Sequence, residues 1–232
     1  ELVNHAWQCS CCVRNISVKS KPVFGLKKSE ILMTIFCKES NHKVRFFSFL
    51  QEFGIIEFMK IVSGIYGGRP LKTLDGKTTR PTSDKVRGAI FNMIGPYFEG
   101  GRVLDLYAGS GGLSIEAVSR GMSSAVLVEK DRRAQSIVKE NIQMTKESSK
   151  FQLLKMEAER ALEQVEGVFD LIFLDPPYAK EQIVADIEKM AEKNLFSEDV
   201  MVVCETDKSV ELPEEIACLG IWKEKIYGIS KV

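Results

Sequence analysis

The segment of the sequence with the most specific chemistry is Asp175-Pro176-Pro177-Tyr178, which directly follows the apolar run 169–174. Two consecutive prolines can neither continue a sheet ladder nor start a helix at once, so they predict a rigid bend at the end of a strand. Such a bend presents the Asp175 carboxylate and the Pro176 carbonyl together. These two acceptors could hold the hydrogens of an exocyclic amine and aim its nitrogen at a methyl donor, so that catalysis would consist mainly of positioning.

Tyr178 places an aromatic ring beside these acceptors. Such a ring could stack on a nucleic-acid base turned out of its helix. The alternative interpretation is a proline-rich turn with a buried tyrosine. The motif alone leaves both interpretations open, and a glycine-rich turn earlier in the chain favours the chemical one.

That turn occupies residues 105–113, after an apolar run. Glycines let the backbone approach a ligand closely, and a helix that follows offers unpaired N–H groups. A nicotinamide-dinucleotide fingerprint would need a third glycine where Ser114 stands, and Asp105 would repel a pyrophosphate. A carboxylate there suits the ammonium and sulfonium groups of S-adenosylmethionine. The residues expected to line this part of the site are Asp105, Ala108, Gly109, Ser110 and Gly111.

Two later strand ends carry polar groups that suit the rest of such a cofactor. Glu129 ends the second strand, where a carboxylate can take both hydroxyls of a ribose. The alternative role, capping the next helix, is already supplied by Asp131. Glu157 and Ala158 end the third strand and are expected to meet the adenine edge, although Glu159 is an equally polar neighbour.

The elements that position these residues alternate between apolar strands and amphipathic helices. This alternation predicts βαβ units and a mostly parallel central sheet with helices on both faces. A short hairpin at 60–72 and a helix at 84–94, with Asp84 near its start, form a small extension before the sheet. Residues 221–232 predict one or two further strands. The expected strands are 102–107, 124–129, 151–156, 169–174 and 200–205, and the expected helices are 111–120, 131–145, 158–165 and 180–193.

The pattern is regular only from Met59 onward. Residues 1–58 have no sustained period, and we expect them to be poorly ordered. They could be an organellar presequence or sequence translated ahead of a start at Met59, and a first strand at 60–63 favours the second interpretation. We therefore predict an extension, 1–58, followed by one domain, 59–232.

Charge is unevenly distributed, although the chain has 32 basic and 32 acidic residues. Residues 59–102 hold 8 basic and 3 acidic side chains, whereas residues 103–232 hold 16 and 24. This distribution predicts that residues 59–101 bind a polyanion and that residues 102–232 form the cofactor-binding and catalytic body. An ordinary solvated surface would explain the same charge distribution. Internal pairing with Asp84 is the alternative for Arg80 and Arg87. The residues predicted to bind nucleic acid are Arg69, Lys72, Lys77, Arg80, Lys85 and Arg87.

Cysteine and histidine usage excludes several classes of mechanism. His5 and the cysteines at 9, 11 and 12 lack the second half of a paired zinc-ligand pattern, so no metal site is expected. No histidine follows His42, which excludes histidine catalysis in the body. The cysteine spacing indicates a reducing compartment, and no apolar run approaches the ~18–20 residues that would cross a bilayer.

Several short segments of the predicted domain together carry a resemblance to one known family: 61–64, 68–69, 79–82, Asp84, Val86, Arg87, 90–92, 109–111, 175–178 and 227–228. On these residues, the segment 59–232 resembles the RsmD family, which are class I, Rossmann-like methyltransferases that act on a guanine N2 of bacterial small-subunit ribosomal RNA. Two departures are visible: Tyr107 stands where the family usually has Phe, which we expect to be harmless, and residues 1–58 have no counterpart.

The resemblance implies a class I methyltransferase fold and S-adenosylmethionine as the donor. It also implies a guanine of 16S ribosomal RNA as the substrate, free or within the small subunit, and a setting in the bacterial cytoplasm. We also expect a monomer. Asp175, Pro176, Pro177 and Tyr178 would be the catalytic residues.

Three other functions stay open at this point. A DNA adenine-N6 methyltransferase would use the same Asp-Pro-Pro-Tyr geometry, but the body has no target-recognition insertion. A ribosome-assembly factor without catalysis would be expected to lose Asp175 or the glycines, and these residues are present. A nicotinamide-dependent oxidoreductase is disfavoured by Ser114 and by the prolines.

Overall fold

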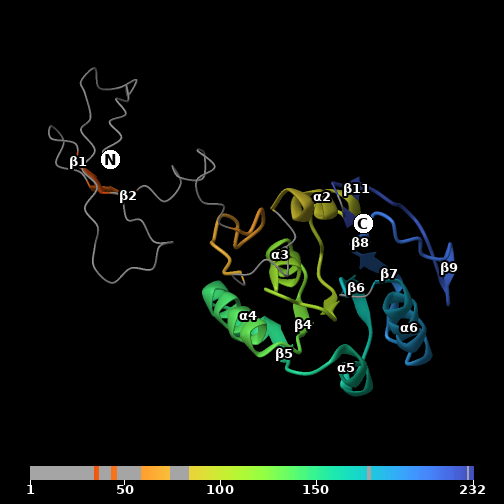
Figure 1. Cartoon of the computed structure of the whole chain (residues 1–232). Helices are drawn as coiled ribbons and strands as arrows, with labels where there is room; N and C mark the ends of the chain where they lie inside the picture. The colour runs from red at the N-terminus through yellow and green to blue at the C-terminus, as the bar shows by residue number, and fades with distance from the viewer. Residues whose placement is uncertain (1–33, 37–42, 46–58, 74–83, 177–178, 229) are drawn as a thin grey trace. The chain divides into compact units, whose positions relative to one another are not determined.

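The computed structural model describes residues 34–36, 43–45, 59–73, 84–176, 179–228 and 230–232 (Figure 1). The chain divides into two units, Glu1–Glu57 and Phe58–Val232. In the first unit, β1 (Thr34–Phe36) pairs antiparallel with β2 (Lys43–Arg45). The other residues of 1–58, which we expected to be poorly ordered, lie outside the described residues.

The second unit is built on a five-stranded sheet in the order β5-β4-β3-β6-β7, and every neighbouring pair is parallel. The predicted parallel sheet is therefore confirmed. The last strand begins earlier than the predicted residue 200, because it runs beside β6 from its start. The strands are β3 (Arg102–Asp105), β4 (Ser124–Val128), β5 (Phe151–Leu154), β6 (Phe169–Leu174) and β7 (Phe196–Cys204).

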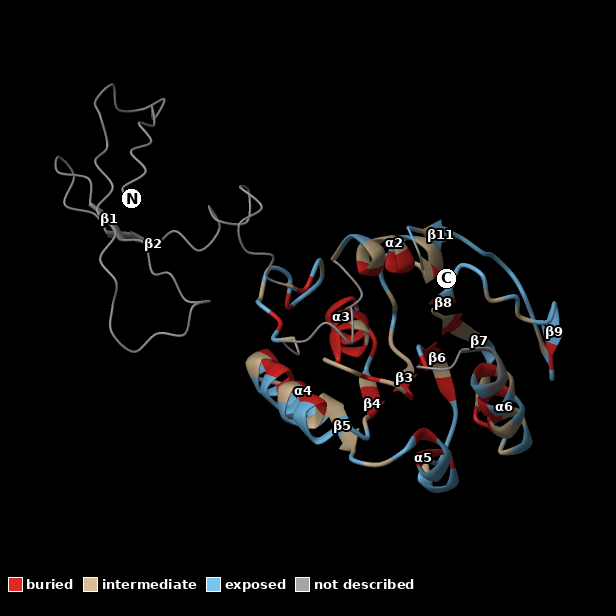
Figure 2. Ribbon diagram, viewed as in Figure 1, coloured by how far each residue is buried: buried red, intermediate tan, exposed pale blue. Residues whose placement is uncertain are grey.

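Helices cover both faces of this sheet, as predicted. Successive residues of a strand point to opposite faces, so Val103 packs with one buried cluster and Leu104 with the other. The first cluster takes side chains from α2, α3 and α4, and the second takes them from α5 and α6 (Figure 2). The helices are α2 (Asp84–Ile94), α3 (Gly112–Ser119), α4 (Arg132–Thr145), the short 3-10 turn η1 (Ser148–Lys150), α5 (Ala158–Gln164) and α6 (Ala179–Glu192).

Helix α4 shows why these segments fold locally as they do. The Asp131 carboxylate accepts hydrogen bonds from the backbone N–H groups of Arg133 (2.8 Å) and Ala134 (2.9 Å), so its predicted capping role is confirmed. The buried residues Ala134, Val138 and Ile142 recur every four positions and form the stripe that packs on the sheet.

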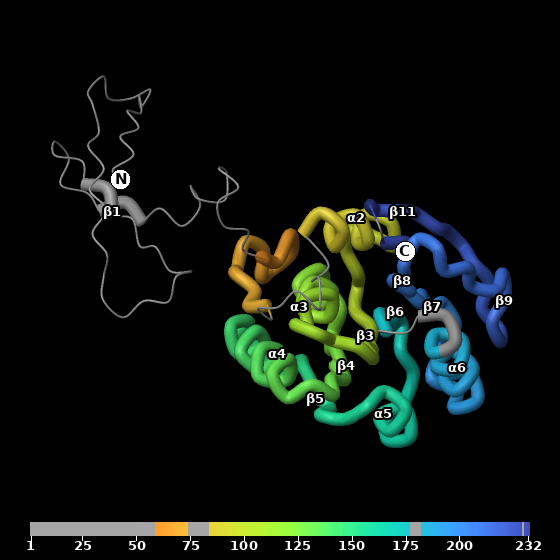
Figure 3. The backbone as a smooth tube through the Cα atoms, viewed as in Figure 1, coloured from red at the N-terminus to blue at the C-terminus, as the bar shows by residue number. Residues whose placement is uncertain are grey.

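The segment 59–73 folds back on itself, as the predicted hairpin requires (Figure 3). The Ile61 N–H donates to the Arg69 oxygen (3.0 Å), and the Leu71 N–H donates to the Met59 oxygen (2.8 Å). The expected strand at 60–63 does not form, and the only ladder pairing there is an isolated bridge between Lys60 and Pro70. The backbone N–H groups of Val62 and Ser63 instead donate to the side chain of Glu116 on α3. At these two residues a side chain thus replaces the strand partner that the sequence pattern implied.

The C-terminal residues form small antiparallel ladders outside the main sheet. Two strands within 221–232 confirm the prediction of one or two there. No helix among the described residues is long and apolar enough to cross a membrane. The strands are β8 (Thr206–Asp207), β9 (Glu215–Ile216), β10 (Leu219–Gly220), β11 (Ile226–Tyr227) and β12 (Ser230–Lys231).

Candidate active site

The first strand of the sheet ends in a buried carboxyl group. Asp105 is 3% exposed, and its Oδ2 accepts a hydrogen bond of 2.8 Å from the hydroxyl of Ser114 on α3. Burial raises the pKa of Asp105 to about 7, although the hydrogen bond from Ser114 opposes the shift. A cation placed beside this carboxyl group would favour its charged form. Sequence reasoning used Ser114 only to exclude a dinucleotide and missed this contact.

The glycine turn after β3 has the shape that was expected, and Gly111 has a structural role in it. Gly111 caps α3 with φ 76°, and a Cβ there would lie 3.1 Å from the Leu127 Cδ2 atom. Gly111 is therefore needed for the turn and its packing on the core. At Gly109, by contrast, a Cβ would meet nothing nearer than the Tyr107 oxygen at 4.0 Å, so a ligand can approach the backbone at this residue.

Glu129 lies against this turn, one residue after β4. Its Oε2 accepts a hydrogen bond from the Gly109 N–H (2.9 Å), and its Oε1 accepts one from the Asp131 N–H (2.7 Å). Each carboxylate oxygen can accept a second hydrogen bond. Glu129 is thus held rigidly beside the turn, with capacity left for two hydroxyl donors.

Asn141 on α4 is a second residue that the sequence did not reveal. It is 1% exposed, and its amide nitrogen donates to the backbone oxygens of Ser110 (2.8 Å) and Lys72 (2.9 Å). Its side-chain oxygen accepts from the Lys72 N–H (2.9 Å). One buried amide therefore fixes the glycine turn to the chain that precedes α2.

The third strand end is less constrained. Glu157 is exposed and lies 4.0 Å from the Lys130 ammonium, whereas Ala158 is buried at the start of α5. Both residues lie after β5, as predicted. Their contact with an adenine stays a prediction.

Asp175 directly follows β6, next to β3 in the sheet. Its side chain is exposed, yet removal of water by the surrounding protein raises its pKa to about 7. The negative charges of Glu205 and Asp105 raise this pKa further. Pro176 is buried, and the side chains of Pro177 and Tyr178 lie outside the described residues.

Three carboxyl groups therefore meet at the carboxyl ends of the adjacent strands β3, β6 and β7, which is the edge where parallel sheets bind ligands. Glu129 and the glycine turn lie on the β4 side of the same edge. The described residues hold no cluster of side chains suited to a metal ion. The arrangement suits a ligand with a positively charged centre near Asp105 and hydroxyl groups near Glu129.

The chain has close relatives over the part that forms this site. A family model described as Conserved hypothetical protein 95 matches residues 59–232. The Bacillus subtilis protein YlbH, provisionally named an rRNA methyltransferase, is 45% identical over 177 residues, which are 75% of this chain and 96% of that protein. Ribosomal RNA small subunit methyltransferase D of Haemophilus influenzae is 33% identical over 176 residues, which are 74% of this chain and 90% of that protein. The chain belongs to the RsmD family.

The fold of this RsmD-family chain matches a solved structure as well. A provisionally named methyltransferase from Escherichia coli, yhhF, superposes with a TM-score of 0.65 at 27% identity, over 75% of this chain and 95% of that one. Together with the parallel sheet, this likeness confirms the predicted Rossmann-like class I methyltransferase fold.

Arg87 of the RsmD-family chain is not placed as predicted. Its side chain is 0% exposed and pairs with Asp84 (2.8 Å) and Glu116 (3.4 Å). A buried, paired guanidinium does not reach a phosphate, so the prediction that Arg87 binds nucleic acid is wrong. Internal pairing with Asp84, the alternative, is confirmed.

The other predicted basic residues are distributed differently. Arg69 donates to the backbone oxygens of Met144 and Thr145 (both 3.0 Å) at the end of α4. Lys72 is exposed and pairs with Glu140. Lys85 is exposed on α2, and Lys77 and Arg80 lie outside the described residues.

Tyr107 joins the glycine turn to α6, the helix that follows the Asp-Pro-Pro-Tyr motif. Its hydroxyl donates to Asp186 Oδ2 (2.6 Å), and the Gln182 amide donates to Asp186 Oδ1 (3.0 Å). Asp186 is 3% exposed, and burial raises its pKa while both hydrogen bonds lower it. The hydroxyl that distinguishes Tyr107 from Phe is therefore engaged with a buried carboxylate.

Tyr107→Phe is expected to lower the free energy of unfolding by about 1–3 kcal/mol, because it removes a hydrogen bond from a buried acceptor. The loss should be smaller at pH 5 than at about pH 8, since the missing bond stabilises the ionised form of Asp186 and matters less once this group is protonated. Urea unfolding at both pH values measures the effect. Equal stability of the two proteins at pH 8 would confirm the expectation that the exchange is harmless.

Proposed function

We propose that this protein transfers a methyl group from S-adenosylmethionine to the N2 amino group of a guanine in small-subunit ribosomal RNA. The observation that carries the proposal is the pair Asp105 and Asp175 at the ends of adjacent strands, one beside the glycine turn and one at the start of the Asp-Pro-Pro-Tyr motif. The names of the relatives support ribosomal RNA as the substrate class.

The residues present fit the donor. Asp105 suits its positively charged methionine end, Gly109 offers an open stretch of backbone, and Glu129 can accept hydrogen bonds from its ribose hydroxyls. Glu157 and Ala158 would meet the adenine. When bound, S-adenosylmethionine supplies an electrophilic methyl group on a sulfonium.

The chain's own contribution is to place the amine. Asp175 and the carbonyl of Pro176 would accept the two amino hydrogens and turn the nitrogen toward the donor. Asp175 can then take the proton that the amine loses on methylation, because a pKa of about 7 suits proton transfer near neutral pH. Tyr178 would stack on the base, and Pro177 would keep the bend rigid.

Binding of the donor should release protons. The pKa of Asp105 is about 7 without ligand, and a cation beside this carboxyl group favours its ionisation. Affinity is therefore expected to rise as the pH increases through about 7 and to level off above it. Calorimetric titration in buffers of different ionisation enthalpy counts the protons. S-adenosylhomocysteine, which lacks the sulfonium charge, should release fewer, and equal release by both ligands would contradict this.

We also propose that exposed basic residues ahead of the sheet contact the RNA backbone. Lys72 and Lys85 remain candidates, together with Lys77 and Arg80, whereas Arg69 first has to leave its contacts with α4. The double variant Lys72→Ala, Lys85→Ala should weaken binding and reduce the salt slope by about two units, one for each lost phosphate contact. Filter binding across a salt series measures both. The double variant Lys208→Ala, Lys225→Ala is the control. An equal change in its RNA affinity and salt slope would contradict the assignment of Lys72 and Lys85 as RNA contacts.

The proposed function is tested by incubating the protein with labelled donor and unmodified small-subunit ribosomal RNA, free and assembled with its proteins. Nucleoside analysis should find the label in N2-methylguanosine. Label in N6-methyladenosine would indicate an adenine methyltransferase instead. Incorporation of label into DNA in a parallel reaction would show that the substrate is DNA and not ribosomal RNA. No label in any of these would favour an assembly factor.

A further inference from the structure

A second carboxyl group lies beside Asp175. Strands β6 and β7 run parallel with Leu174 opposite Cys204, and the Glu205 N–H donates to the Leu174 oxygen (2.8 Å). Asp175 and Glu205 are each the next residue along, so their side chains leave the same face of adjacent strands, about 5 Å apart in backbone spacing. Glu205 is half-buried, and its charge acts on Asp175. A base whose amine is held by Asp175 would thus have Glu205 at the neighbouring position.

The neighbouring position distinguishes the bases that carry an amine. In guanine, N1 next to the amino group bears a hydrogen and is a donor. In adenine and cytosine, the ring nitrogen next to the amino group has a lone pair and is an acceptor. An ionised carboxylate is an acceptor only, so it forms a hydrogen bond with guanine and repels the other two.

We propose that Glu205 is a specificity-determining residue that accepts a hydrogen bond from the N1–H of guanine while Asp175 and Pro176 hold the N2 amine. This inference rests on the proposed function. It adds a residue outside the Asp-Pro-Pro-Tyr motif and assigns the choice of base to the end of β7. No charge or bond order changes at Glu205 during the reaction, since its role is to hold the Watson–Crick edge of the base.

A different role would be purely electrostatic. Glu205 raises the pKa of Asp175, so it could act on the rate only through the protonation of that residue. In that case, removing its charge would shift the acid limb of the pH–rate profile to lower pH and would affect every base equally. A hydrogen bond to N1 predicts an effect that depends on the base.

The test uses the whole protein and a small-subunit RNA whose target guanine has been located by nucleoside mapping. A second RNA carries 2-aminopurine at that position, which keeps the amino group but replaces the N1–H with a lone pair. The wild type should prefer guanine by about 10- to 100-fold in kcat/KM, the usual size of a lost hydrogen bond to a charged group. Glu205→Gln should lose most of this preference, because an amide can donate to the lone pair as well as accept.

Two further variants make the outcome decisive. Glu205→Asp keeps the charge but shortens the reach, so it should lower kcat/KM on guanine without moving the pH profile. Glu198→Gln, an exposed residue of the same strand, should behave as wild type. Donor affinity and the thermal midpoint, measured for each variant, identify a folding defect.

The outcomes separate the two proposals. Equal losses of Glu205→Gln on both RNAs, with a shifted pH profile, would overturn the N1 contact, as would an unchanged preference. A wild type that methylates guanine and 2-aminopurine equally would overturn it too, but would leave the proposed function standing. A wild type that methylates no guanine would overturn the proposed function itself.

Discussion

Asp175→Asn is expected to lower kcat by about 10²-fold or more and to leave the affinity for S-adenosylmethionine nearly unchanged. The amide keeps the size of the side chain and an oxygen that can accept from the amine, but it cannot take a proton near neutral pH. The expected loss is therefore that of the proton acceptor. Because we propose that Asp175 holds the substrate amine and not the donor, the loss should appear in turnover and not in donor binding.

Single-turnover methylation with saturating RNA measures the chemical step, and calorimetry measures the donor affinity. Asp199→Asn, an exposed residue of β7, is the matched control and should retain wild-type turnover. Turnover of Asp175→Asn within a few-fold of wild type would mean that Asp175 only shapes the bend.

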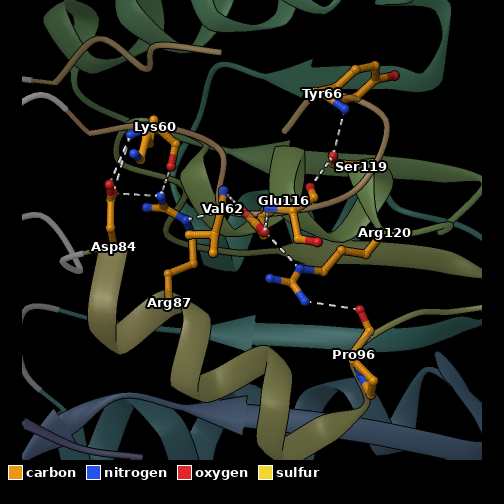
Figure 4. A network of polar contacts seen from close by, with 10 residues as sticks. Lys60, Val62, Tyr66, Asp84, Arg87, Pro96, Glu116, Ser119 and Arg120 are labelled. Atoms are coloured by element: carbon orange, nitrogen blue, oxygen red, sulfur yellow. Dashed lines mark hydrogen bonds and ion pairs between the residues drawn. The ribbon is translucent and has the colours of Figure 1, made fainter. Parts of the chain in front are cut away.

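The second large effect is expected from a buried charge network that joins three parts of the chain (Figure 4). Glu116 on α3 is 0% exposed and accepts hydrogen bonds from the Arg120 side chain (2.7 Å) and the Arg87 side chain (3.4 Å). Its two oxygens also accept from the backbone N–H groups of Val62 (2.7 Å) and Ser63 (2.9 Å). One carboxylate thus pairs with two buried cations and accepts hydrogen bonds from two backbone amides.

Glu116→Ala should lower the free energy of unfolding by about 3–5 kcal/mol, because it leaves buried charges without their counter-ion. This is a large share of the stability of a typical domain, so the milder Glu116→Gln, which keeps an acceptor, should be measured beside it. Urea unfolding followed by circular dichroism gives both values.

Glu163→Ala is the control for this prediction. Glu163 also pairs with two cations, Lys189 and Lys193, but its side chain is 54% exposed, so its removal should change stability little. Similar losses for Glu116→Ala and Glu163→Ala would show that burial does not set the strength of the network.

The sheet and the strand-end positions of the site could be predicted from the sequence because both depend on local pattern. Short apolar runs separated by amphipathic helices indicate a parallel sheet, and this order places Asp105, Glu129 and Asp175 at one edge. The cap at Asp131 follows from its place before an apolar-periodic run, and the structure confirms it.

What the sequence did not reveal depends on contacts between distant residues. Ser114 and Asn141 are ordinary helix residues until the fold brings Asp105 and Ser110 next to them. Counting charges assigned Arg87 to the basic face, because a count contains no information about burial. The strand expected at 60–63 did not form for the same reason, since the N–H groups of Val62 and Ser63 donate to the side chain of Glu116 on α3.

The attachment of this segment to α3 has a consequence for synthesis on the ribosome. The N–H groups of Val62 and Ser63 donate to Glu116, which lies 54 and 53 positions later in the chain. The Tyr66 N–H donates to the Ser119 hydroxyl, also 53 positions later. A chain made from its N-terminus exposes these amides before it has made their acceptors. The segment 60–66 therefore has to stay hydrated through the emergence of β3 and most of α3. A stall placed just before Glu116 leaves the exit tunnel should leave these amides open to rapid hydrogen exchange. A stall placed after the whole sheet has emerged should find them protected together, because the later strands hold α3 in place.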